Sequence, residues 1–173
     1  YWAPMLWGFD GHVDLEGKCY GTVADLHASH LDMTINNHTN IVCNGYIKGL
    51  PNIEETVIKA EIDNLSTDAN ILSHVSLPLS WGKVNIPSIA YKLGRIEMSG
   101  LFQGLISEFT AMCNIKTNAG NIIANANISQ NDTTNEYQYL GYVSSPSFAI
   151  TKIIPNNWIT TTGFEFSIIG EGF

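Results

Sequence analysis

The stretch "RIEMSGLFQGLISEFTA", residues 95–111, repeats a pattern that begins 83 residues earlier in "HVDLEGKCYGTVADLHA", residues 12–28. The two copies share three small residues at matching places: Gly17 with Gly100, Gly21 with Gly104, and Ala28 with Ala111. Both copies alternate apolar and polar residues around their glycines. Glycine inside such a pattern marks a bulge, a kink or a close approach of two backbones. The repeat therefore predicts two copies of one β-strand unit.

Alternation with a period of two continues through most of the chain, and it places one apolar and one polar row on each strand. The clearest alternating segments are 31–36, 41–48, 58–63, 122–129 and 164–170. Clusters of turn-forming residues separate them at 36–40, 49–52, 117–120, 131–135 and 144–147. Residues 66–75 could form one short helix, and 147–154 fit a strand or a helix. The sequence predicts an all-β, mostly antiparallel fold.

The segment "FEFSIIGEG", residues 164–172, starts the pattern a third time, with Phe166, Ile168 and Gly170 standing where Val13, Leu15 and Gly17 stand. An array has a reason to restart its pattern near its last residues, whereas a closed barrel or sandwich does not. We therefore expect residues 1–173 to form a single elongated, curved sheet. Its units cover approximately 9–92 and 93–163, and a third begins at 164.

The composition excludes several classes of function. Charged residues make up only 14% of the 173, where about 25% is typical. The net charge of −8 and the scattered Lys and Arg argue against binding to nucleic acid or docking on anionic lipid headgroups. No apolar run approaches the roughly 18 residues of a membrane-spanning helix. The chain starts with Tyr1, so we expect it to be an internal piece of a longer protein.

The sequence offers only weak motifs for a catalytic or metal-binding site. His27 and His30 are separated by an odd number of residues, so on a regular strand their rings would point to opposite faces. The acidic residues paired by the repeat, Asp14/Glu97 and Asp25/Glu108, fall on the polar rows and are expected to be solvated. No nucleophile elbow, phosphate-binding glycine loop or zinc-ligand spacing is present. We expect no enzyme activity, no cofactor and no metal site.

The three cysteines Cys19, Cys43 and Cys113 leave two alternatives open. They could form one disulfide with a spare thiol, or three buried free thiols.

Residues 77–129, 139–154 and 168–173 resemble the periplasmic repeat region of the TamB family, in the version seen in the Bacteroides group. This family of translocation and assembly module proteins is related to the AsmA-like bridge proteins. Residues 21–68 resemble the segment that precedes that region. The matching positions are Leu93, Gly94, Gly100, Gly104, Phe109, Thr117, Gly120, Tyr139, Gly141, Phe148, Gly170 and Gly172. Residues 147–154 depart from the family pattern because no Leu-Gly pair follows Phe148.

The resemblance implies a β-taco, a folded-over sheet with a hydrophobic groove that carries phospholipid acyl chains between the inner and outer membranes. It implies a periplasmic location and an inner-membrane anchor supplied by a segment outside this chain. It also implies a TamA-like outer-membrane barrel as partner, which we do not expect this stretch to contact. A second function discussed for such proteins is a scaffold for outer-membrane protein assembly.

On this interpretation the apolar rows line the groove. The candidate lipid-groove residues are Ile35, Ile41, Ile47, Ile58, Ile62, Ile96, Met98, Ile122, Ile128, Phe164 and Phe166. The alternative is an ordinary β-sandwich adhesin or binding module in which a second sheet covers the same rows.

Overall fold

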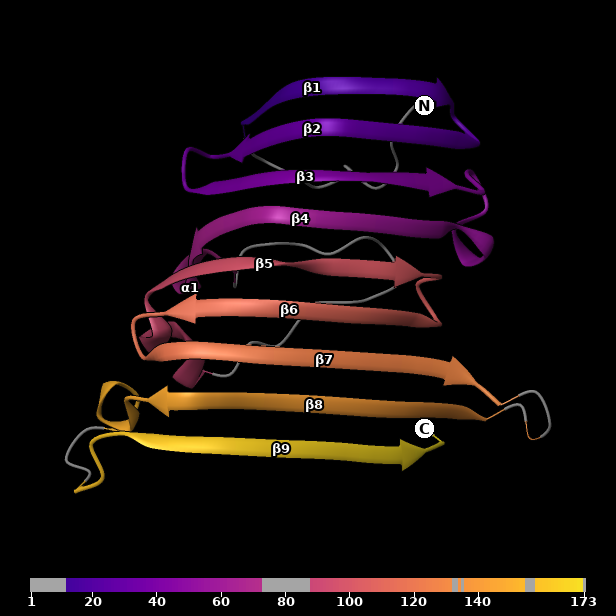
Figure 1. The fold of residues 1–173 in the computed structure, drawn as a ribbon. Coiled ribbons are helices and arrows are strands. Elements are labelled where there is room, and N and C mark those ends of the chain that lie inside the picture. The colour runs from indigo at the N-terminus through magenta and orange to yellow at the C-terminus, as the bar shows by residue number, and fades with distance from the viewer. Residues whose placement is uncertain (1–11, 73–87, 132–133, 135, 155–157, 173) are drawn as a thin grey trace.

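Nine antiparallel strands form a single sheet whose spatial order equals the order along the chain (Figure 1). The structure, a computed structural model, describes residues 12–72, 88–131, 134, 136–154 and 158–172. The strands are β1 (Val13–Thr22), β2 (Asp25–Ile35), β3 (Thr39–Lys48), β4 (Val57–Asp68), β5 (Arg95–Gly104), β6 (Phe109–Thr117), β7 (Gly120–Gln130), β8 (Tyr137–Phe148) and β9 (Thr162–Glu171). The predicted all-β, mostly antiparallel fold is confirmed.

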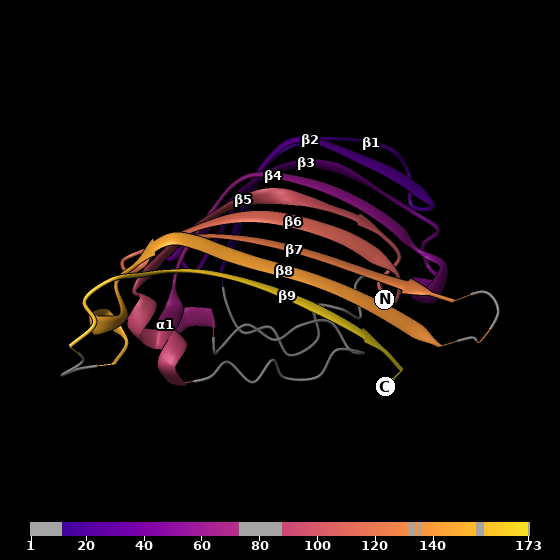
Figure 2. The same ribbon diagram turned by 60° about the horizontal axis from the view of Figure 1, so that its bottom comes forward.

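Each strand bends along its length, so the sheet forms an arch, and the short helix α1 (Ala69–Leu72) lies under it (Figure 2). Helix α1 and the 3-10 helix η3 (Ser88–Leu93) follow β4, and a second 3-10 helix, η4 (Ile150–Lys152), follows β8. All three lie at the edge of the arch where β4 and β8 end, which we call the α1 rim. A further 3-10 helix, η2 (Ile53–Glu55), lies between β3 and β4 at the opposite rim.

Local sequence explains the tight turns. Asn36 and Asn37 connect β2 to β3 with positive φ values of 51° and 57°. Asparagine tolerates this left-handed conformation better than most residues, and two-residue hairpin turns of the primed type require it. Residues 117–120 form a turn of a different kind, because Asn118 and Ala119 lack positive φ values. In it the Thr117 hydroxyl accepts hydrogen bonds from the N–H groups of Ala119 and Gly120, both at 3.1 Å.

The structure corrects two expectations about local elements. Residues 66–75 could form one short helix, and a helix does lie there, but β4 continues through Asp68 and α1 covers only Ala69–Leu72. Residues 73–75 lie outside the described part of the chain. Residues 144–147 were expected to form a turn, but they lie inside β8. Pro146 fits there because the pairing of β8 with β9 shifts register between Ser145 and Phe148, and proline is tolerated at such an irregularity. The turn at 131–135 lies partly outside the described residues.

The two copies of the opening pattern form hairpins with the same register. Gly21 pairs with Leu26 across the β1–β2 hairpin, and Gly104 pairs with Phe109 across the β5–β6 hairpin. The copies differ at the other glycine, because β1 shifts register around Gly17 whereas β5 pairs regularly with β6 at Gly100. The repeat of about 83 residues stays a prediction.

The described residues form one layer without a conventional core. Their only buried apolar side chains are those of Ala69, Ala119 and Phe148. These three residues lie at the α1 rim, where α1, η3 and η4 cover the strand ends. Within the described ranges no second sheet packs on the first, so the β-sandwich alternative does not describe this arrangement.

Candidate functional site

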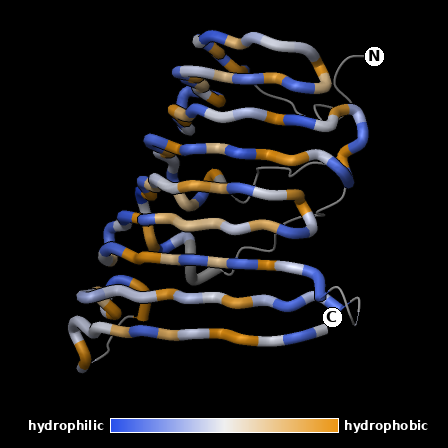
Figure 3. The backbone as a smooth tube through the Cα atoms, turned by 45° about the vertical axis from the view of Figure 1, so that its right-hand side comes forward, coloured by the Kyte–Doolittle hydropathy of each residue, from blue (hydrophilic) through white to orange (hydrophobic). Residues whose placement is uncertain are grey.

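The strand register places the apolar rows of all nine strands on one face. Directly paired residues point to the same side of a sheet, so a chain of pairs identifies the face from one strand to the next. One such chain connects all nine strands through Cys19, Ala28, Gly45, Ala60, Phe102, Ala111, Ala126, Gly141 and Ile168. Figure 3 shows the hydropathy alternating along each strand as this arrangement requires.

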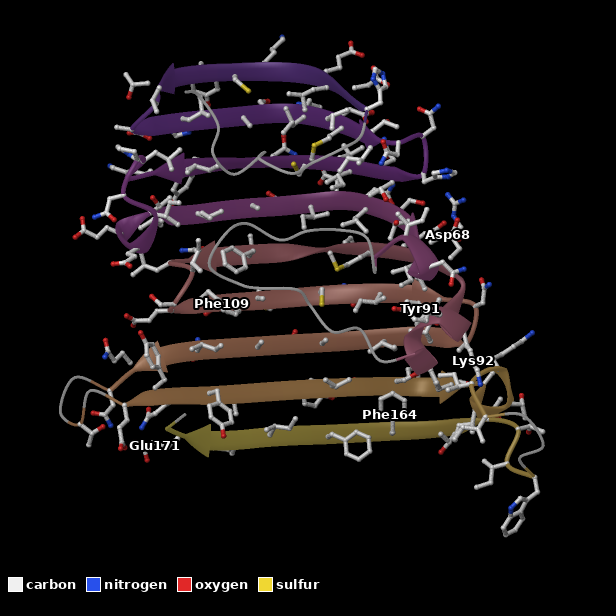
Figure 4. The ribbon with its side chains drawn as sticks, turned by 180° about the vertical axis from the view of Figure 1, so that it is seen from behind. Asp68, Tyr91, Lys92, Phe109, Phe164 and Glu171 are labelled. Carbon is white, nitrogen blue, oxygen red and sulfur yellow. The ribbon has the colours of Figure 1, made fainter. Side chains whose placement is uncertain are left out.

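This face is the concave side of the arch. In Figure 4, which views the sheet from behind, the rings of Phe109 and Phe164 stand in front of the ribbon, on the side where α1 lies. Figure 2 places α1 under the arch. We call this surface the concave face.

All eleven groove candidates lie on the concave face, at pairs such as Ile35 with Thr39 and Phe166 with Val143. Most are half-buried, and Phe166 is 61% exposed. The sheet therefore brings together every residue that the sequence analysis selected.

Side-chain size varies across this face in a regular way. Over β6, β7 and β8 the middle of the face carries mainly small residues: Ala111, Cys113, Ala124, Ala126 and Gly141. Larger side chains flank them, with Ile115 and Ile122 toward the α1 rim and Phe109, Ile128 and Tyr139 toward the opposite rim. The middle strip of the face is thus lower than its two flanks.

The three cysteines are free, and all three point to the concave face. Desolvation raises the pKa of the Cys43 thiol above its ordinary value, and the nearby carboxylate of Asp63 adds to the effect. Desolvation also raises the pKa of Cys113, partly offset by its hydrogen bond to the Ala124 carbonyl. Both thiols are therefore protonated at neutral pH and add no charge to this face.

The convex face carries the polar rows. On it the His27 ring stacks on Tyr20 with centroids 5.1 Å apart, and the His27 Nε2 atom lies 3.1 Å from the Asp25 carboxylate. Glu97 lies 3.5 Å from the Arg95 guanidinium.

In the part of the chain that the structure describes, no group of three or more His, Cys, Asp or Glu side chains is placed to hold a metal ion. A register shift between Ala28 and Leu31 interrupts the alternation of β2. Alternation therefore does not place the rings of His27 and His30 on opposite faces. The Glu108 carboxylate accepts a hydrogen bond from the Gln130 N–H at 3.2 Å and is therefore only partly solvated.

An apolar pocket of about 470 Å³ lies on the concave side at the α1 rim, and we call it the η4 pocket. Its lining residues are Phe148, Ile150, Ile153, Ile154, Thr162, Gly163, Phe164 and Phe166. The sequence analysis selected only Phe164 and Phe166 of this set. Ile150, Ile153 and Ile154 have the spacing of one helix face, and this spacing was the available signal for the others.

Comparison of the chain with protein-family models, with curated proteins and with solved structures returned no match in any of the three. Among the described residues, no helix has the length and apolar character needed to cross a membrane.

Proposed function

We propose that this chain is a segment of a lipid conduit, in which the concave face holds acyl chains as they move between two membranes. The observation that supports the proposal is the unbroken apolar face across nine strands. Within the described residues only three apolar side chains are buried. A sheet that leaves so much apolar surface open needs an apolar occupant to replace water.

The energetics favour such an occupant. Exposure of a hydrocarbon tail to water costs about 0.8 kcal/mol per CH₂ group. Contact with a continuous apolar surface removes most of that cost at every step, so a tail can move along the face without a large barrier. Such transport requires no catalytic residue and no specific headgroup site.

The resemblance to the TamB family gives this proposal its biological setting. The segment would act in the periplasm, joined to the inner membrane through a part of the protein outside this chain. Phospholipid would be the cargo and a TamA-like barrel the outer-membrane partner.

The sharpest test compares two neighbouring isoleucines of β7. Ile122 points to the concave face and Ile123 to the convex face, where it is 42% exposed. We expect Ile122→Arg to remove co-purified lipid, because an acyl chain loses free energy beside a hydrated charge. Ile123→Arg introduces the same charge on the other face and should retain lipid. Native mass spectrometry of the purified chain measures the bound lipid.

Thermal unfolding of both variants completes the test. The Ile122→Arg guanidinium can reach water if the face is open, so its Tm should fall by only a few degrees. Unfolding of Ile122→Arg alone would mean that another layer covers this position, because a buried unpaired charge is strongly destabilising. A wild-type chain without lipid, or an Ile122→Arg variant with its full lipid load, would contradict the proposal.

A further inference from the structure

The η4 pocket differs from the rest of the concave face because the connection after β8 supplies three apolar side chains along one side of it. After β8, the N–H of Ala149 donates a hydrogen bond to the Ala119 carbonyl at 2.6 Å, and the chain then turns through η4. The N–H groups of Ile153 and Ile154 both bond to the Ile150 carbonyl, at 2.9 and 2.8 Å. These bonds hold three isoleucines opposite the strand phenylalanines.

Three phenylalanine rings form the sheet side of the pocket. The centroids of Phe148 and Phe164 lie 5.6 Å apart, and those of Phe164 and Phe166 lie 5.5 Å apart. The pocket volume of about 470 Å³ falls within the roughly 300–1,000 Å³ range of small-ligand sites. The pocket is open to solvent on one side, and its apolar lining fits one hydrocarbon chain.

Two lysines belong to the connections next to this pocket. The Lys92 Nζ atom, which η3 supplies, donates a hydrogen bond to the Ile153 carbonyl at 2.7 Å, and Ile153 lines the pocket. Lys152 precedes Ile153 in the chain and is exposed. Figure 4 shows Lys92 beside the η4 connection. Neither lysine forms an ion pair with any described carboxylate. An ammonium group has three donors, so Lys92 has two left for a ligand.

Most described carboxylates lie away from η4. Asp68 is at the α1 rim, but it ends β4, four strands away from β8. Glu165, the nearest acid along β9, pairs with Ser144 on the convex face. The opposite rim carries Asp25, Glu54, Glu55, Glu108, Glu136 and Glu171. The chain has a net charge of −8. An anion at the α1 rim near η4 is nevertheless closer to Lys92 and Lys152 than to the carboxylates named above.

We propose that the η4 pocket binds one acyl chain of an anionic amphiphile, with its carboxylate or phosphate held by Lys92 and Lys152. The proposal deepens the proposed function and rests on it, because the ligand belongs to the same lipid class. It adds a fixed binding site and a charge preference to a face that otherwise has neither.

Binding of cis-parinaric acid to the full chain, followed by its fluorescence, tests this proposal. We expect Lys92→Gln combined with Lys152→Gln to weaken binding by about tenfold, because two charge-assisted contacts are lost. The matched control, Lys18→Gln combined with Lys116→Gln, removes the same charge from the convex face and should bind within about twofold of wild type. Parinaryl alcohol should bind wild type and the pocket variant equally.

A second pair of variants excludes an effect of misfolding. Ile154 is 51% exposed and lines the pocket, so Ile154→Glu should fold normally and repel the carboxylate. Val23, in the β1–β2 turn, is 58% exposed, and Val23→Glu should bind as wild type.

Phosphatidylglycerol that carries a parinaroyl chain separates the two sources of an anion. Tighter binding of this lipid would indicate a phosphate headgroup, and tighter binding of the free acid would indicate a carboxylate.

The outcomes separate this proposal from the proposed function. Unchanged binding by the double lysine variant, or no binding by wild type, overturns the η4 pocket as an anion site. Loss of co-purified lipid in Ile122→Arg would still support the conduit in either case. Weakened binding in the pocket variants, with normal parinaric acid binding by Ile122→Arg, supports the pocket whatever the conduit test shows.

Discussion

Gly104 has a φ of +138°, a backbone conformation that residues with a side chain rarely adopt. A Cβ atom at this position would also collide with the backbone carbonyl oxygen of Glu108. We expect Gly104→Ala to lower the free energy of unfolding by about 1–3 kcal/mol, because the strained conformation and the collision add. Urea denaturation followed by circular dichroism measures the change.

Gly141 provides the matched control. It lies in the middle of β8, and a Cβ atom there would lie 3.6 Å from the Cβ of Ile168, an ordinary contact distance. Gly141→Ala should therefore change the free energy of unfolding by less than about 0.5 kcal/mol. Equal destabilisation by the two substitutions would show that the backbone at Gly104 is not the constraint.

The cysteines report on the concave face without any substitution. Cys19 is exposed, whereas Cys43 and Cys113 are half-buried and have raised thiol pKa values. At pH 8 we expect iodoacetamide to modify Cys19 fastest, because fewer thiolates form at the other two positions. Mass spectrometry of the peptides gives the three rates, and guanidinium-unfolded protein should show three similar rates.

The same two pKa shifts predict how stability depends on pH. A raised thiol pKa means that the unfolded chain releases its proton at a lower pH than the folded chain. Cys43 and Cys113 therefore leave stability unchanged well below the ordinary thiol pKa of 9.0, and stability falls as the pH rises past it. A Cys43→Ala and Cys113→Ala double variant should lose this alkaline decline, and its persistence would assign the decline to other groups.

Individual residues could be placed on a face from sequence because side chains alternate along a strand. This rule correctly grouped all eleven groove candidates, including Ile35 at one end of the sheet and Phe166 at the other. The rule fails at a bulge, because an inserted residue breaks the alternation. His30 lies at such an irregularity with a φ of 50°, and its neighbouring sequence contains no residue pattern that predicts a bulge.

At the scale of elements, strands were more predictable than their connections. Alternation marks a strand directly, as in β7. The connection after β8 has no such periodicity, and its position depends on contacts with distant residues, such as the hydrogen bond from Ala149 to Ala119. Pro146 and its neighbours have the composition of a turn, yet they extend β8, because pairing with β9 outweighs local preference.

The η4 pocket was also difficult to predict from the sequence. Its three isoleucines come from a connection and its phenylalanines from two strands, so only the folded chain brings them together. Lys92 comes from yet another connection, 61 residues from Ile153. A sequence can reveal the apolar spacing of each piece, but their assembly depends on the register of the strands between them.

For the whole molecule, the strand order predicts a gradient of local stability. Each strand contacts its sequence neighbours, and among the described residues β1 and β9 each have only one neighbouring strand. Hydrogen exchange should therefore be slowest in β4, β5 and β6 and fastest in β1 and β9, because a layer without a second sheet opens from its ends. Protection of β9 equal to that of β5 would instead mean that another chain pairs with its free edge.

Because the strands follow one another in chain order, the number of strands also sets the width of the sheet. Neighbouring strands lie about 4.8 Å apart, so nine strands cover roughly 38 Å across the sheet. Gain or loss of one hairpin would change this span by about 10 Å and leave the surroundings of residues several strands away unaltered. Duplication or deletion of hairpins can therefore widen or narrow such a sheet in steps of two strands, without redesign of its cross-section.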